Sequence, residues 1–99
     1  MKVLLVNGSS RQNGCTNAAL CEVERALQEE GIETEMFFIG NEALPDCIAC
    51  RKCKETGRCV FNDAVNDFVE KAKSADGFVF GSPVYFAHPS GRLLTFMDR

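Results

Sequence analysis

Three short apolar segments, each followed by a turn and then by a segment of helical periodicity, constrain this chain's fold more than any other feature. The apolar segments are residues 2–6, 34–39 and 77–81, and helical patterns follow at 16–30, after Asn62 or Asp63, and from Gly91. Alternating strands and helices imply a parallel sheet with helices on its faces, joined by right-handed crossovers. The sequence therefore predicts an α/β fold with three α/β/α layers around a doubly wound parallel sheet.

The element boundaries follow from local patterns. Residues 3–6 are continuously apolar before Asn7-Gly8, which is typical of a strand buried on both faces. In 16–30 the apolar positions 19, 20, 23, 26 and 27 form one helical stripe. Thr16 can cap this helix and Gly31 can end it. Residues 44–60 and 82–90 show no sustained period and are predicted to be loops.

The chain has 99 residues, enough for one small domain. It stops after Met97-Asp98-Arg99, a short way into an apolar helix, so we expect residues 1–99 to be the N-terminal part of a single, truncated domain. In a sheet of order 2-1-3 the apolar strand 77–81 is an open edge, and such edges recruit other chains. We therefore expect either a homo-oligomer or a longer chain that covers this edge.

Charge and composition exclude several functions. The formal net charge is −3, whereas nucleic-acid binders are normally basic. No apolar run approaches the length of a membrane span, and residues 3–6 are too few for a signal peptide. These features predict a cytoplasmic protein without nucleic-acid or membrane partners. In that reducing compartment the six cysteines favour metal binding or redox chemistry over disulfides.

The first loop, residues 7–16, joins a strand to a helix N-terminus and is predicted to bind phosphate. A helix N-terminus offers free N–H groups and the positive end of a dipole to an anion. The candidate ligands are Ser9, Ser10, Arg11, Cys15 and Thr16, which suit a phosphate monoester such as that of FMN. The loop matches neither the Walker A nor the G-x-G-x-x-G pattern. The alternative interpretation is a polar turn with a capping threonine.

The third loop is predicted to border a flat ring. In a doubly wound sheet, ligands bind beside the carboxyl ends of the strands near the switch point, which brings the first and third loops together. Pro83, Val84, Tyr85 and Phe86 are the candidate residues for covering the ring. The alternative is that Tyr85 and Phe86 pack under the loop. We nominate no catalytic side chain: hydride transfer to a flavin needs no histidine base, so His88 is interpreted as exposed or structural.

The segment 44–60 contains the most specific motif, C-x2-C-x2-C-x5-C, formed by Cys47, Cys50, Cys53 and Cys59. Ferredoxin-type runs share the C-x2-C-x2-C opening, whereas structural zinc more often uses separated C-x2-C pairs. The spacing favours a [4Fe–4S] cluster, with zinc, disulfides and free thiols as alternatives. The interleaved basic residues Arg51, Lys52, Lys54 and Arg58 would offset a cluster's negative charge or attract an acidic electron-transfer partner. Cys21 is interpreted as a packing or bystander residue.

Together the three loops resemble the NADPH-dependent FMN reductases of the flavodoxin-like superfamily and, more narrowly, the iron–sulfur flavoproteins. The resemblance rests on 7–11 with 14–16, on the four cysteines, on 81–85 and on the closing 96–99. It implies a flavodoxin-like sheet, of which this chain supplies the 2-1-3 part of the order 2-1-3-4-5. It further implies that the first loop holds the FMN phosphate, that Pro83-Val84-Tyr85 borders the flavin, and that the cysteines hold a [4Fe–4S] cluster.

The leading hypothesis is an FMN-dependent NAD(P)H oxidoreductase that exchanges electrons with a small-molecule or protein donor or acceptor, with the cluster as one-electron partner. FMN converts between two-electron and one-electron transfer, and the protein positions it. One alternative is a cluster-free FMN or quinone reductase whose cysteine loop is structural. Another is a non-enzymatic, flavodoxin-like electron carrier whose basic cysteine loop docks a partner. The 99-residue piece alone is expected to be inactive, because the resemblance implies a third flavin loop that it lacks.

Overall fold

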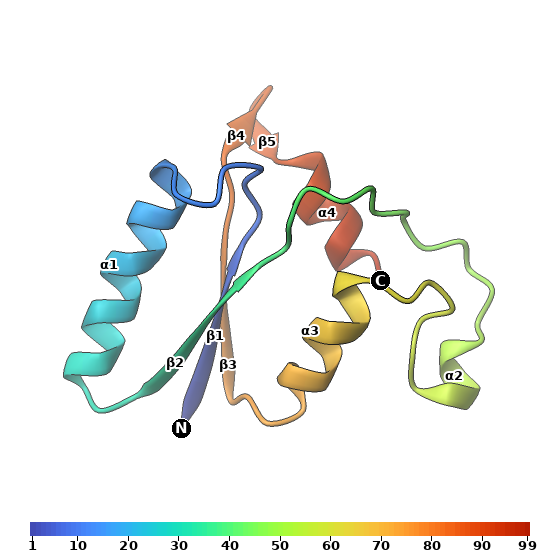
Figure 1. The fold of residues 1–99 in the computed structure, drawn as a ribbon, viewed down its shortest axis with the longest axis horizontal. Coiled ribbons are helices and arrows are strands. Elements are labelled where there is room, and N and C mark those ends of the chain that lie inside the picture. Colours follow the sequence, from blue (N-terminus) through green and yellow to red (C-terminus); the bar gives the residue numbers. More distant parts are fainter.

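Each of the three main strands is followed by at least one helix along the chain in the computed structural model, which describes residues 1–99 (Figure 1). The elements are β1 (Lys2–Asn7), α1 (Cys15–Glu29), β2 (Glu33–Phe38), α2 (Cys53–Thr56), α3 (Ala64–Ala72), β3 (Gly77–Gly81), β4 (Val84–Tyr85), β5 (His88–Pro89) and α4 (Gly91–Met97). None of the helices is long and apolar enough to cross a bilayer.

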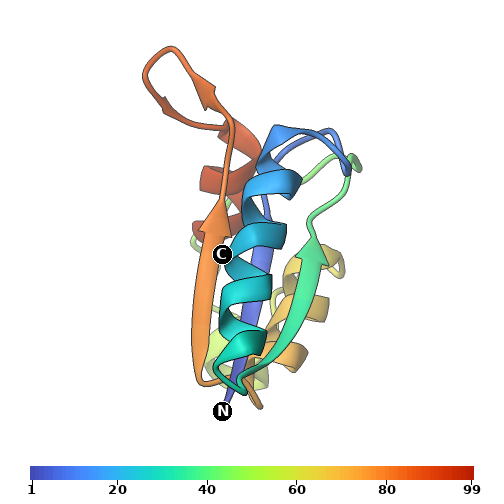
Figure 2. The ribbon, with the colours of Figure 1, turned by 90° about the vertical axis from the view of Figure 1, so that its left-hand side faces the viewer.

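The main sheet has three parallel strands in the order β2-β1-β3, as predicted (Figure 2). Its register places Val6 of β1 between Phe37 of β2 and Phe80 of β3. Residues 3–7 of β1 are all buried, because a neighbouring strand pairs with each edge. The central apolar run of the sequence therefore forms the centre of the sheet.

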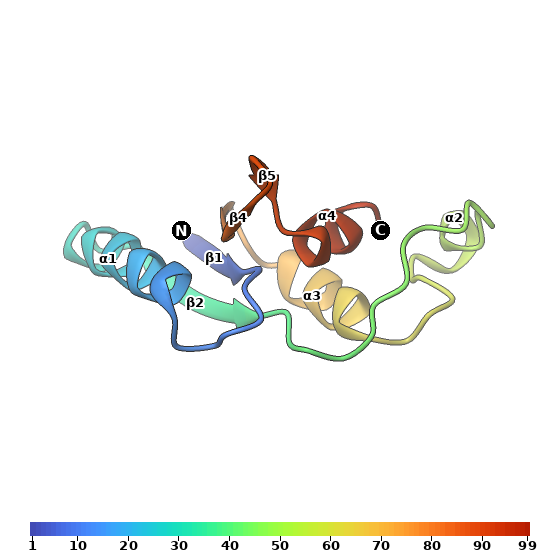
Figure 3. The same ribbon diagram turned by 90° about the horizontal axis from the view of Figure 1, so that it is seen from above.

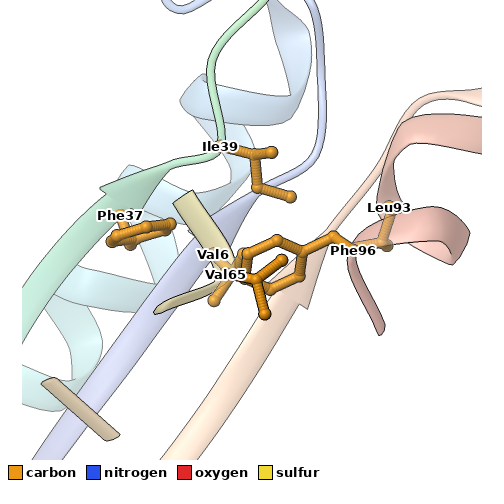
Figure 4. Packing of buried hydrophobic residues seen from close by; sticks show 6 residues of the cluster. All are labelled: Val6, Phe37, Ile39, Val65, Leu93 and Phe96. Atoms are coloured by element: carbon orange, nitrogen blue, oxygen red, sulfur yellow. The ribbon is translucent and has the colours of Figure 1, made fainter. Parts of the chain in front are cut away.

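Helices cover both faces of the sheet, which confirms the three-layer flavodoxin-like arrangement (Figure 3). α1 lies on one face, and α3 and α4 lie on the other. The core between the sheet and α3 and α4 is a buried cluster, composed of Val6, Phe37, Ile39, Val65, Leu93 and Phe96 (Figure 4). Phe68 completes it, with ring centroids 5.4 Å from Phe37 and 5.1 Å from Phe96.

The outer edge of β3 has no partner strand. Phe78 and Phe80 are therefore 44% and 39% exposed, as expected for the open edge of a 2-1-3 sheet, although the apolar sequence of β3 is typical of a strand buried on both faces. The difference arises because burial on both sides requires a further strand beyond β3. The bounds of β3, in contrast, agree with the prediction.

Several local predictions are corrected. Segment 44–60 is not entirely a loop: it contains the single-turn helix α2, which ends at Gly57 with φ 73°. Residues 82–90 contain the β4–β5 hairpin. Thr16 does not cap α1, which begins one residue earlier with Gly14 at its N-cap position. Of the predicted stripe on α1 only Leu20 is buried, because the helix contacts a narrow, three-stranded sheet.

Other predictions of helix ends are confirmed. Asp63 caps α3 by accepting a hydrogen bond from the Val65 N–H at 3.1 Å. Gly31 follows α1 with φ 76°, a left-handed conformation that glycine adopts without strain. Ser90, for which no role is predicted, caps α4 through the Leu93 N–H at 3.2 Å.

Candidate functional site

The first loop is organised by two buried polar residues at its start. Oδ1 of Asn7 accepts a hydrogen bond from the Ser9 N–H at 2.9 Å, and Nδ2 of Asn7 donates to the Gln12 carbonyl at 3.3 Å. Oγ of Ser9 accepts a hydrogen bond from the Arg11 N–H at 3.1 Å. Asn7 and Ser9 therefore shape the loop from within, and Ser9 is less free to bind a ligand than the sequence suggests.

The N-terminus of α1 remains open toward solvent. No side chain caps it, and its first turn carries no acidic residue. The first N–H groups of a helix have no intrahelical acceptor, and the helix dipole makes this end attractive to anions. Around it, Ser10, Arg11 and Cys15 are exposed and Thr16 is half-buried. The arrangement therefore offers backbone donors, hydroxyls and one guanidinium to an anion.

Two hydrogen bonds to the backbone of Gly8 connect the first loop to the third. The Gly8 N–H donates to the Gly81 carbonyl at 2.8 Å, and the Ser90 hydroxyl donates to the Gly8 carbonyl at 2.8 Å. A Cβ atom on Gly8 would lie 3.0 Å from Cβ of Leu93 and 3.1 Å from the Gly81 oxygen. Gly8 therefore allows the two loops to approach closely at the carboxyl end of the sheet.

The third loop forms a hairpin that extends away from the sheet (Figures 1 and 2). Val84 pairs with Pro89, and Tyr85 pairs with His88. The two connecting residues, Phe86 and Ala87, have φ of 51° and 67°. Hairpins of this length favour positive φ at both positions, usually supplied by Asn-Gly. Non-glycine residues in this conformation carry strain.

Most predicted ring-binding side chains project into solvent. Pro83 is half-buried, whereas Val84, Tyr85 and Phe86 are exposed, and Phe86 is 98% exposed. No cavity of this chain is lined by residues of the first loop or the hairpin. The structure thus brings the two loops together at one edge of the sheet, but these 99 residues do not enclose a ring there.

The four motif cysteines surround a different region, a cavity of about 230 Å³ between segment 47–61 and α3. α2 and the chain on either side of it lie beyond α3 and α4, away from the first loop and the hairpin (Figures 1 and 3). Cys47, Cys50 and Cys53 are exposed and Cys59 is half-buried. The cavity wall also includes apolar residues of α3 and the side chain of Arg99.

The cysteine segment has an unusual backbone. Ala49 and Arg51 have φ of 56° and 64°, so the chain curls sharply between successive cysteines. In this conformation the Ala49 N–H points at Sγ of Cys47 at 3.4 Å. Hydrogen bonds of this kind orient a side chain that ligates a metal group.

Arg99 approaches the same cavity from the end of α4. Its Nε–H donates to Sγ of Cys59 at 3.2 Å, and its two terminal nitrogens bind the Asp63 carboxylate at 2.6 and 2.8 Å. The hydrogen bond to Asp63, above all, raises the pKa of Arg99 above its ordinary value. The guanidinium therefore remains charged beside the Cys59 sulfur.

The donor chemistry fits an iron–sulfur cluster, since four thiols from one short segment line one cavity. In a cubane cluster each thiolate binds a different iron, so the ligands surround a volume rather than converge on one point. No three His, Cys, Asp or Glu side chains lie close enough together to hold a single metal ion. The residues that would hold the cluster are Cys47, Cys50, Cys53 and Cys59.

Several residues of these sites lack a local sequence signal. Asn7, Asn66 and Arg99 are polar residues that the fold buries and pairs with backbone groups or carboxylates. Ser90 had a usable signal, because it stands directly before a helical segment, where serine is a preferred cap. Cys21, interpreted as a packing or bystander residue, is exposed on α1, which agrees with the second alternative.

Comparison with known proteins decides the family. Residues 1–99 match the family model described as NADPH-dependent FMN reductase over their whole length. The chain belongs to this family. Members of the NADPH-dependent FMN reductase family share the flavodoxin-like arrangement that the 2-1-3 sheet displays here.

Curated relatives carry names that include both redox groups. The chain is 44% identical over 99 residues to an iron-sulfur flavoprotein of Methanocaldococcus jannaschii, covering all of this chain and 51% of the relative. It is 31% identical over 99 residues to the iron-sulfur flavoprotein of Methanosarcina thermophila, covering 52% of that protein. The chain is 33% identical over 105 residues to an iron-sulfur flavoprotein of Clostridioides difficile, and the match covers 45% of that protein. The chain spans about half the length of these curated relatives.

Proposed function

We propose that this chain is the phosphate-binding first part of a flavodoxin-like domain in an FMN-dependent NAD(P)H oxidoreductase. Residues 1–99 would be completed by a second half of similar length, as in the relatives that this chain half covers. The whole is called the full-length protein below. Its electron partners would be small molecules or proteins.

The main observation behind the proposal is the uncapped N-terminus of α1. It lies at the end of the first loop, which is hydrogen-bonded to the third loop. Uncapped N–H groups, the half-buried Thr16 and the exposed Arg11 and Ser10 together offer several donors to one phosphate. The links from Gly8 to Gly81 and Ser90 hold this phosphate loop beside the hairpin. A phosphate bound there would place an attached ring system toward residues 83–86.

When bound, FMN would supply the redox chemistry, which interconverts hydride and single-electron transfer. The residues of this chain would position it: the first loop holds the phosphate, and Pro83, Val84, Tyr85 and Phe86 border the ring. Because those side chains are exposed here, the second half of the full-length protein or another subunit would close the site. No side chain is needed as an acid or base.

We further propose that Cys47, Cys50, Cys53 and Cys59 hold a [4Fe–4S] cluster as the one-electron partner of the flavin. Support comes from the shared cavity, from the N–H donors that face two of the four sulfurs, and from the names of the relatives. Arginines that line the cavity, among them Arg51 and Arg99, would offset the charge of the bound thiolates.

The activity is tested by mixing full-length protein with NADPH or NADH without oxygen and recording the flavin absorbance. An oxidoreductase of this kind bleaches its flavin on addition of the nicotinamide alone. A flavin that stays oxidised until a separate reductase is added would contradict the enzyme proposal and indicate an electron carrier.

A further inference from the structure

Cys59 differs from the other three motif cysteines in how firmly the protein holds it. Cys47, Cys50 and Cys53 are exposed, whereas Cys59 is half-buried. Three hydrogen bonds reach Cys59 from distant elements: two to its backbone from Asn66 and one to its sulfur from Arg99. Its main chain and its side chain are therefore both held by contacts within this chain.

The side chain of Asn66, on α3, is hydrogen-bonded to the backbone of Cys59. Asn66 is buried, with only 2% of its surface exposed. Oδ1 accepts the Cys59 N–H at 2.9 Å, and Nδ2 donates to the carbonyls of Cys59 and Phe61, each at 3.1 Å. All three hydrogen bonds join the buried Asn66 amide to residues 59–61. This segment therefore cannot move without leaving polar groups unpaired.

Arg99 uses all of its donors, and one of them faces the Cys59 sulfur. Its side chain is 1% exposed. The two terminal nitrogens donate to both Asp63 oxygens and to the carbonyls of Pro45 and Phe61, at 2.6 to 3.0 Å. A guanidinium has five N–H groups, so only Nε–H remains, and it points at Sγ of Cys59.

These contacts hold the planar guanidinium of Arg99 in one orientation. Asp63 is itself the N-cap of α3, and the Arg99 cation also lies 5.2 Å from the centroid of the Phe61 ring. A less constrained arginine could turn away from the sulfur to find another acceptor. Here such a turn would break four further hydrogen bonds, so the Nε–H donor stays in place when the sulfur becomes a ligand.

We propose that Arg99 and Asn66 are positioning residues that present Cys59 as the preformed ligand of the cysteine site, and that Nε–H of Arg99 raises the reduction potential of the bound cluster. The inference rests on the proposed cluster function. N–H donors to ligating sulfurs stabilise the more negative, reduced state of an iron–sulfur centre, and outer hydrogen bonds orient the ligands themselves.

Arg58 provides a matched control, because it precedes Cys59 directly but binds Glu70 and Asn62 instead of a cysteine sulfur. Arg58→Lys and Arg99→Lys both preserve a positive charge. Lysine cannot reproduce the fixed fork of donors that arginine supplies. A general effect of charge near the cluster would therefore treat the two substitutions alike, whereas the Nε–H to Sγ contact is lost only in Arg99→Lys.

The first experiment is a redox titration of the anaerobic, iron-loaded full-length protein, monitored by electron paramagnetic resonance. We expect Arg99→Lys to lower the ratio of reduced to oxidised cluster about tenfold at a fixed potential, which is a shift of about 59 mV for a one-electron couple. Arg58→Lys should leave the potential unchanged. Equal potentials in wild type and Arg99→Lys, or equal shifts in both variants, would overturn the role of Arg99. If the wild-type protein binds no iron, the result would contradict the proposed cluster function and not the role of Arg99.

A second measurement does not depend on cluster assembly in a variant. Amide hydrogen exchange of the metal-free full-length protein should show the Cys59 N–H protected at least tenfold relative to those of Cys47 and Cys50. Asn66→Ala should remove this protection. Exchange at Cys59 as fast as at the other two cysteines would overturn the claim that this ligand is preformed, whatever the iron content.

Discussion

At the scale of single residues, Gly8 decides how the phosphate loop meets the rest of the sheet. Its N–H and carbonyl are bonded to Gly81 and Ser90, and its α-carbon faces Leu93. A side chain at this point would push against a backbone oxygen and against the first turn of α4, neither of which can yield easily. The close contact thus links the geometry of the first loop to that of the third.

Gly8→Ala should therefore destabilise the full-length protein by about 1–3 kcal/mol, the usual cost of forcing a methyl group into a filled space. Gly91→Ala is the control, because a Cβ atom there has no neighbour within 4 Å. At the start of α4 that change should be neutral or stabilising by up to about 1 kcal/mol. Urea unfolding measures both, and equal free energies of unfolding for the two variants would contradict the packing argument.

Arg11 and Thr16 are expected to act through the phosphate of FMN. Each hydrogen bond to a charged group contributes about 1.5–3 kcal/mol, so Arg11→Ala with Thr16→Ala should weaken FMN binding at least about tenfold. Riboflavin lacks the phosphate and should be affected far less. Fluorescence titration of both flavins into the metal- and flavin-free full-length protein gives the comparison. Equal losses for the two ligands would mean that the loop does not recognise phosphate.

Some roles of single residues could be predicted from neighbours in sequence, and others could not. The Asp63 cap and the turn at Gly31 depend on residues one or two positions away, and the structure confirms both. The roles of Asn66 and Arg99 depend on partners 7 and 40 residues away. No local pattern marks such a buried polar contact, which becomes visible only when α3, α4 and the cysteine segment are assembled.

At the scale of elements, hydrophobic patterning predicted the three strands of the main sheet and the longer helices. It did not predict the β4–β5 hairpin, because Phe86-Ala87 lacks the Asn-Gly signature of a two-residue turn. Nor did it predict α2, whose four residues are too few to show a period. The cysteine spacing predicts a cluster site; the four cysteines line one cavity, and the cluster itself stays a prediction.

Because the cysteine segment is separate from the phosphate loop, we expect cluster binding and flavin binding to be independent. Cys53→Ser in the full-length protein should abolish the cluster and leave the flavin content close to that of wild type, because the two sites occupy different elements. Cys21→Ser, which changes an exposed cysteine on α1, should leave both groups in place. Iron and flavin are counted per chain after anaerobic purification. Loss of flavin together with iron in Cys53→Ser would contradict the assignment.

At the scale of the whole molecule, the most consequential feature is the uncovered side of β3. Phe78, Phe80 and Met97 lie on or beside it with 39 to 56% of their surface exposed. Burying a large apolar side chain contributes about 1.5–3 kcal/mol, so this surface favours any partner that can cover it. In the full-length protein we expect the second half of the chain to do so.

Residues 1–99 produced alone should therefore associate with other copies through this edge. They should also bind FMN weakly, because the exposed hairpin residues have nothing opposite them to enclose the ring. Analytical ultracentrifugation with and without FMN tests both expectations. A stable monomer that sediments with tightly bound yellow flavin would contradict them.

The full-length protein is proposed to combine FMN with a cluster held by segment 47–59. The most direct test is the FMN, iron, zinc and acid-labile sulfide content of the protein purified without oxygen. We expect about one FMN, four iron and four sulfide per chain, the composition of a single [4Fe–4S] centre beside a flavin. Stoichiometric zinc without iron, or protein that retains no flavin, would contradict it.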